Sequence, residues 1–147
     1  MNFYLKYLFF IVLFLILSSC QTGYVISDTP LSVKDTRRAF VVALGSVRSV
    51  SSNGREVYSY YHDQNFKIIN NPNLVKQRYY TKLIILGARR PYDVDVQVRE
   101  EVKSRETEGY EDIGLDQNLS EIRGQNIKKV LNQSRAKTVN VDGEDPF

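Results

Sequence analysis

The sequence has little cysteine, little histidine and little excess charge. Its 147 residues include one Cys, one His and no Trp, with 20 Lys and Arg against 17 Asp and Glu. A single Cys cannot form a disulfide within the chain, and near-balanced charge gives no strong tendency to bind nucleic acid. Gly-x-Ser-x-Gly, His-Glu-x-x-His and phosphate-cradling glycine motifs are absent. We therefore predict a protein that is not an enzyme and has neither a metal nor another cofactor.

One long apolar run is present, near the amino terminus. Residues 7–17 carry no charge, follow Lys6, and lead through two serines to Cys20. A positive start, an apolar stretch and small residues before a cleavage point form a signal peptide. A membrane-spanning helix is disfavoured, because eleven residues rise only about 16 Å against a hydrocarbon core of about 30 Å. The same run is also compatible with an ordinary secretory signal or a buried core helix.

The four residues Leu17, Ser18, Ser19 and Cys20 resemble the lipobox of bacterial lipoproteins, which has Leu at −3, small residues at −2 and −1, and Cys at +1. The resemblance implies cleavage after Ser19 and acylation of Cys20, whose fatty chains would bind the membrane. Gln21 occupies +2, where Asp would imply retention in the inner membrane. By the same resemblance the protein is expected on the outer membrane, facing the periplasm, rather than on the inner membrane or the cell surface.

The remaining chain is expected to hold one domain. We predict a signal peptide over residues 1–19, a lipidated tether over 20–31, a single domain over 32–138, and a disordered acidic tail over 139–147. Gly23, Ser27, Asp28 and Pro30 favour irregular structure in the tether. Even fully extended, the tether would reach only about 36 Å, so the domain would remain near the bilayer.

Two segments have helical periodicity. The first begins after Ser32, a favourable N-cap with Asp35 in the first turn, and ends near Gly45 and Ser46. Its apolar positions are Val33, Phe40, Val41, Leu44 and Val47. A strand remains possible there, because Val41 and Val42 are β-branched. The second helix is predicted from Leu115, with apolar positions Leu115, Leu119, Ile122, Ile127, Val130 and Leu131.

Alternating patterns predict the strands. Residues 55–62 form a tyrosine-rich strand after a turn at 49–54, and residues 65–73 form a loop. The strongest pattern is a hairpin over 77–103 that reverses at Gly87–Pro91, with Asp93, Asp95, Gln97 and Arg99 on a solvated face. Residues 103–114 are predicted to form a charged loop. The predicted fold class is α+β: an antiparallel sheet of three or more strands with two helices packed on one face.

Catalytic and metal-binding groups are few. His62 adjoins Asp63, but a hydrolase also needs a nucleophile, and the only thiol is assigned to the anchor. We therefore interpret His62 as a polar residue at a strand end. Asp93 and Asp95 share a strand face and could hold a metal or act as an acid pair, although paired carboxylates on a solvated face are common.

Two groups of residues are candidates for binding. Arg89, Arg90 and Tyr92 lie at the hairpin tip, where guanidinium groups could bind a phosphate or carboxylate of a partner or lipid. Tyr58 and Tyr60 share one strand face and could contact a sugar ring or a protein. We predict a lipoprotein that acts through protein contacts as an envelope assembly, adaptor or structural component. A second hypothesis is a binding module for a cell-wall glycan or an anionic lipid.

Overall fold

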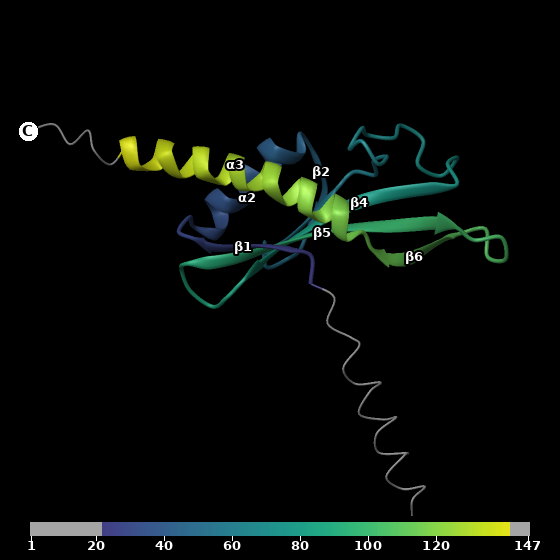
Figure 1. Ribbon diagram of the computed structural model, residues 1–147, viewed down its shortest axis with the longest axis horizontal. Coiled ribbons are helices and arrows are strands. Elements are labelled where there is room, and N and C mark those ends of the chain that lie inside the picture. Colours follow the sequence, from purple (N-terminus) through teal and green to yellow (C-terminus); the bar gives the residue numbers. More distant parts are fainter. Residues whose placement is uncertain (1–21, 142–147) are drawn as a thin grey trace, which may run out of the picture.

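The computed structural model describes residues 22–141, with side chains through residue 137 (Figure 1). It confirms the predicted α+β class, with a six-stranded antiparallel sheet and two helices on one of its faces. The elements are β1 Tyr24–Thr29, α2 Val33–Leu44, β2 Val47–Val50, β3 Glu56–Ser59, β4 Gln77–Leu86, β5 Tyr92–Lys103, β6 Tyr110–Leu115 and α3 Gln117–Val141.

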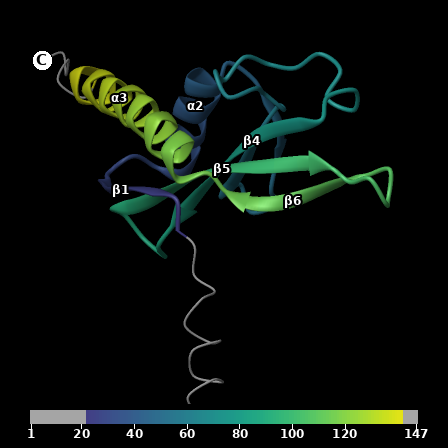
Figure 2. The same ribbon diagram turned by 45° about the vertical axis from the view of Figure 1, so that its right-hand side comes forward.

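The predicted hairpin is confirmed as β4 and β5, which form the centre of the sheet. The strand order is β1-β5-β4-β3-β2, and β6 pairs with the part of β5 beyond β1. The pairing Leu83↔Val96 and Ile85↔Val94 directs these four side chains to the helices, where at most 2% of each is exposed. Figure 2 shows α2 and α3 together on that side. Phe40 of α2 and Ile127 of α3 complete this core.

The opposite side of the sheet carries no helix, and we call it the open face. Its side chains alternate with those of the core along each strand, because neighbouring residues of a strand point to opposite faces. The pairings Tyr58↔Lys82 and Glu56↔Ile84↔Asp95 place these residues on it. The open face also includes Val25, Tyr80, Leu86, Gln97 and Arg99.

The first helix is confirmed over Val33–Leu44 and contains both Val41 and Val42. The alternative prediction of a strand at this position is therefore wrong. The Ser32 hydroxyl accepts a hydrogen bond from the Asp35 amide at 3.1 Å, which satisfies an otherwise unpaired donor of the first turn. Gly45 ends the helix with φ 76°, a left-handed conformation that glycine adopts without steric cost. Val47, which was predicted in the helix, begins β2 instead.

The second helix begins at Gln117 rather than Leu115, which belongs to β6. The Asp116 carboxylate caps it by accepting the Leu119 amide at 2.9 Å. Leu119, Ile127 and Leu131 are buried as expected, whereas Ile122 is 43% exposed. The helix continues to Val141. The predicted tail is therefore wrong for residues 139–141, and residues 142–147 lie outside the described part.

The predicted tether is wrong for residues 24–31, and the domain begins before residue 32. Residues 24–29 form β1, which pairs with β5, and Leu31 is 6% exposed in the core. The register shifts between Ile26 and Thr29, where Asp28 has φ 59°. This irregularity removes the alternation by which a strand is recognised in sequence.

Two further strands lie where loops were predicted. β2 occupies part of the predicted 49–54 turn, and β6 occupies the end of the predicted 103–114 loop. Asp95 also differs from expectation, because it is 4% exposed rather than solvated. Its carboxylate accepts hydrogen bonds from the Gly23 amide at 2.9 Å and the Gln97 side chain at 2.7 Å, which offset the cost of burial.

Candidate functional site

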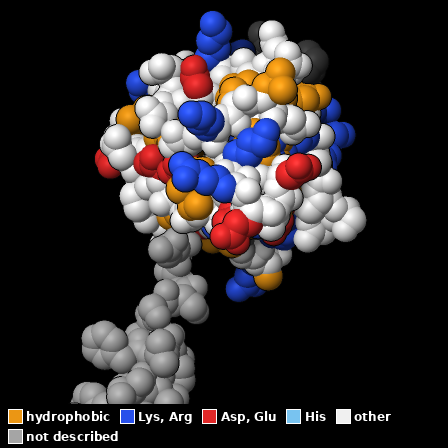
Figure 3. All heavy atoms as spheres, turned by 90° about the vertical axis from the view of Figure 1, so that its right-hand side faces the viewer, with side chains coloured by type: hydrophobic (Ala, Val, Ile, Leu, Met, Phe, Trp, Pro, Cys, Tyr) orange, Lys and Arg blue, Asp and Glu red, His pale blue; other side chains and the backbone are white. Residues whose placement is uncertain are grey.

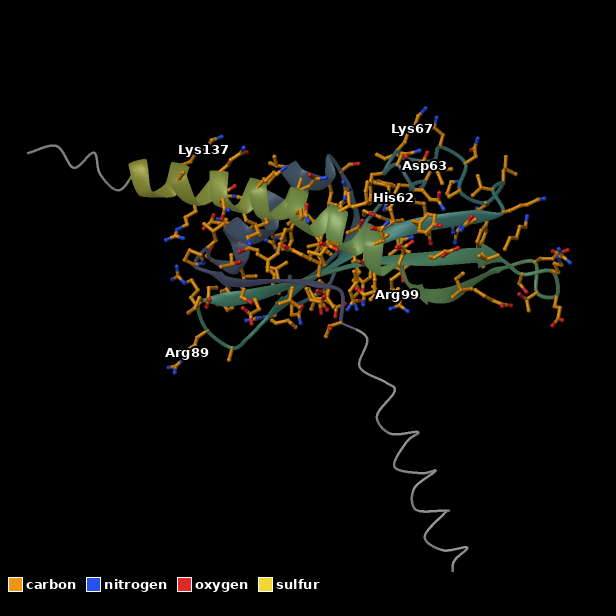
Figure 4. All side chains as sticks on the ribbon, viewed as in Figure 1. His62, Asp63, Lys67, Arg89, Arg99 and Lys137 are labelled. Atoms are coloured by element: carbon orange, nitrogen blue, oxygen red, sulfur yellow. The ribbon has the colours of Figure 1, made fainter. Side chains whose placement is uncertain are left out.

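The arginine turn is the first candidate binding site. Figure 4 shows Arg89 at the β4–β5 tip, pointing away from the body of the domain. Arg90 lines an open cleft together with Arg135 of α3, Asp28, Pro30 and Pro91. Lys128 of α3 lines an adjoining crevice that shares Asp28 and Arg135. The fold therefore brings cationic side chains of α3 next to the arginine turn. The spacing of these residues in the sequence does not indicate that they lie together.

Tyr92 is less exposed than the two arginines of the turn. Its ring packs against the edge of the main core, and the Arg55 guanidinium lies over it at 5.3 Å from the ring centre. Arg55 also donates to the carbonyls of Gly87 at 2.6 Å and Ile85 at 3.2 Å. These contacts fix the base of the turn, so the exposed members of the predicted group are Arg89 and Arg90.

The second candidate, Tyr58 with Tyr60, lies on and just beyond β3. Tyr58 is half-buried on the open face, and its hydroxyl donates to Glu56 at 2.6 Å. That hydrogen bond is the main reason why the pKa of Glu56 is lowered. Tyr60 lies past the end of the strand and is 46% exposed. Tyr60 is therefore the more accessible ring of the pair.

An arginine–tyrosine cluster beside these residues was not predicted. The Arg78 guanidinium lies 3.8 Å from the ring centre of Tyr61 and 3.5 Å from that of Tyr110, and Arg48 lies 4.3 Å from Tyr61. Arg78 is 7% exposed and makes a 2.7 Å ion pair with Glu101. Guanidinium groups already cover the faces of these rings. Because Tyr61 belongs to the 60–76 loop and Arg78 to β4, the cluster holds that loop against the sheet.

Burial also fixes the ionisation of Tyr80, which lies edge-on to Tyr61 in this cluster. Burial, together with the charge of Asp112, raises the pKa of Tyr80 to about 12. The hydroxyl is therefore protonated at neutral pH and donates to Asp112 at 3.1 Å. Arg99 holds the same carboxylate at 2.7 Å, which ties β6 to β5 on the open face.

His62 lies inside the domain rather than at an exposed strand end. It is 1% exposed, and its ring packs on Phe66 and stacks on Tyr79. Nδ1–H donates to the Asp63 carbonyl at 2.8 Å, and Nε2 lies 3.1 Å from the Thr81 hydroxyl. The Asp63 carboxylate instead accepts the amides of residues 65 and 67. It therefore shapes the loop and does not orient the imidazole.

The buried imidazole predicts a specific pH dependence. Burial, reinforced by the charge of Arg123, lowers the pKa of His62 below 6.5. As the pH falls through about 6.5, the unfolded chain gains a proton that the folded chain resists, so stability falls until the lowered folded pKa is reached. We expect His62→Gln to remove this contribution, reducing the slope of unfolding free energy by at most about 1.4 kcal/mol per pH unit. Urea denaturation of both proteins at several pH values between 7 and 5 measures it. Parallel profiles would contradict the assignment.

The paired aspartates Asp93 and Asp95 both bind the amino-terminal segment. Asp93 accepts the Asp28 amide at 3.1 Å, and Asp95 accepts the Gly23 amide. Residues 22–141 contain no group of three or more His, Cys, Asp or Glu side chains suited to a metal ion. The two carboxylates thus secure β1 and the residues before it.

Surface charge is mixed at the end of the molecule that carries the 104–109 loop. Figure 3 shows Lys and Arg side chains interspersed there with Asp and Glu.

Across the described residues, no helix is both long and apolar enough to cross a membrane. The apolar run and Cys20 lie outside those residues, so lipid anchoring stays a prediction. No protein-family model, curated protein or solved structure matches the chain.

Proposed function

We propose that the chain is a lipid-anchored envelope protein that presents a small α+β domain to a protein partner at the outer membrane, on the periplasmic side. It acts without catalysis, as an assembly, adaptor or structural component. The observation that carries the proposal is the attachment of Gly23, three residues after the Cys20 of the lipobox, to the sheet through a hydrogen bond from its amide to Asp95. Acyl chains on that sulfur would hold the domain directly against a leaflet, where its contacts with neighbouring proteins are made.

The anchor is tested by Cys20→Ser in cells. We expect the variant to lose the mass of the acyl chains and to leave the membrane fraction, because two or more chains supply the stable attachment. Intact mass and membrane fractionation measure these effects. Ser19→Ala keeps a small residue before the cleavage point and serves as the matched control. A Cys20→Ser protein that matures normally and remains in the membrane fraction would refute the anchor.

The contact function is tested by crosslinking the anchored protein in intact cells. The expected result is one envelope protein recovered at fixed stoichiometry. Recovery of a glycan or lipid without a protein partner would favour the second candidate function.

That second function is binding of an anionic headgroup or glycan, and the cleft lined by Arg90 and Arg135 favours it. The test uses the mature chain with Cys20→Ser and co-sedimentation with phosphatidylglycerol vesicles. Each cation near an anionic surface contributes about 1 kcal/mol, so Arg90→Ala with Arg135→Ala should weaken binding by about 30-fold. Arg105→Ala with Lys129→Ala removes the same charge at exposed sites elsewhere. Equal loss in both pairs would show that net charge alone, and not the cleft, is responsible.

A further inference from the structure

The two residues before β1 are held tightly at the edge of β5. The Gly23 amide donates to Asp95 at 2.9 Å, and the Gln117 side chain donates to the Thr22 carbonyl at 3.0 Å. A Cβ on Gly23 would lie 2.1 Å from the Val96 carbonyl oxygen, so only glycine fits this approach. The position of Thr22 is therefore fixed relative to the sheet.

The direction in which the chain reaches this edge is also fixed. Asp95, which accepts the Gly23 amide, belongs to the open face. The next side chain, that of Tyr24, lies on the helix side and packs directly on Gly124 of α3. Figures 1 and 2 show the short purple segment that leads into β1 turning away from α2 and α3.

We propose that the open face lies against the lipid headgroups, an inference that depends on the proposed acylation of Cys20. The Cα atoms of Cys20 and Thr22 are two peptide units apart, at most about 7 Å. An acylated sulfur so near the open side of the β5 edge brings that side, and not the helices, to the leaflet.

The chemistry of the open face suits a headgroup layer of either charge. Four of its charged side chains form ion pairs within the domain: Lys82 with Glu56 at 3.3 Å and Arg99 with Asp112 at 2.7 Å. In Figure 4 Arg99 lies on the side of the sheet away from α3. Tyr58 and Tyr80 add amphipathic rings, which are favourable at membrane interfaces. Val25 and Leu86 add aliphatic surface that is 42% and 40% exposed.

Two single-cysteine variants test the orientation, because an acylated Cys20 leaves the engineered thiol as the only one to label. Leu86→Cys is on the open face, and Val42→Cys, at a position 73% exposed on α2, is its counterpart on the other side. The lipidated variants, each carrying a fluorophore, are placed in phosphatidylethanolamine vesicles with a headgroup quencher. We expect loss of fluorescence from the Leu86 site and none from the Val42 site.

Equal quenching at both sites, or stronger quenching at Val42, overturns the orientation while leaving the anchor intact. Co-sedimentation of the labelled protein separates the two proposals. A protein that sediments with the vesicles but is quenched at neither site also overturns the orientation. A protein that fails to sediment overturns the anchor itself and the orientation with it. Because the vesicles contain no other protein, quenching there reports a lipid contact and not a protein partner.

Discussion

Arg78→Ala is expected to destabilise the domain by about 3–5 kcal/mol, the cost of removing one partner from a buried ion pair. Glu101, whose side chain is 15% exposed, would keep its charge without the guanidinium that lies 2.7 Å away. The same guanidinium donates to Asn73 at 3.1 Å and to the Tyr61 hydroxyl at 3.1 Å. Because those partners belong to the 60–76 loop, the loop should lose its attachment to β4. Urea denaturation measures the free energy, and amide exchange locates the loosened loop.

Two further variants separate the effect of charge from that of geometry and of burial. Arg78→Lys keeps the charge but loses the planar fork and the stacking on the tyrosine rings, so it should recover only part of the stability. Arg38→Ala also removes a paired arginine, but its side chain is 69% exposed, and surface pairs of this kind contribute at most about 1 kcal/mol. A loss at Arg78 as small as that at Arg38 would show that the cluster does not hold the loop.

The sequence predicted those elements whose burial pattern lies within one segment. The first helix has a cap and an apolar face of its own, and β4 and β5 have long alternating runs closed by a turn. Edge strands lack such a signal. β6 contains no fully buried residue, and only Ile26 and Thr29 of β1 are buried. Their stability comes from hydrogen bonds to β5, which depend on residues distant in the chain.

The prediction of candidate sites was limited for the same reason, because each site depends on contacts between segments that are distant in the sequence. The position of Arg90 at a turn could be predicted, but its neighbour Arg135 is brought to the cleft by the packing of α3. The alternation of β5 placed Asp95 on a solvated face, yet Gly23 from another segment covers it. His62 was interpreted as a polar residue at a strand end, whereas the fold buries its ring against Phe66 and Tyr79. The local sequence pattern thus predicts the face of the strand on which a side chain lies. Which residues of other segments contact that side chain depends on the fold.

Gly124→Ala is expected to destabilise the domain by about 1–3 kcal/mol, the usual cost of overpacking. Helix propensity alone predicts the reverse, a gain of about 1 kcal/mol for Ala over Gly in a helix interior. The contact decides the sign, because a Cβ at position 124 would lie 2.1 Å from Cδ1 and 2.9 Å from Cβ of Tyr24. The clash reaches the base of that side chain, so rotating the ring cannot relieve it and β1 must shift. Thermal and urea denaturation measure the change.

A double-mutant cycle separates the clash from any general intolerance of position 124. In a Tyr24→Ala background the obstructing ring is absent, so Gly124→Ala should become neutral or stabilising. Gly109→Ala is the control for removing a glycine, because a Cβ there meets its nearest atoms at 3.7 Å. Unchanged destabilisation in the Tyr24→Ala background would contradict the packing of β1 on α3. Since that packing fixes Tyr24 on the helix side and thereby the way in which the chain enters β1, the proposed membrane orientation would then lose one of its supports.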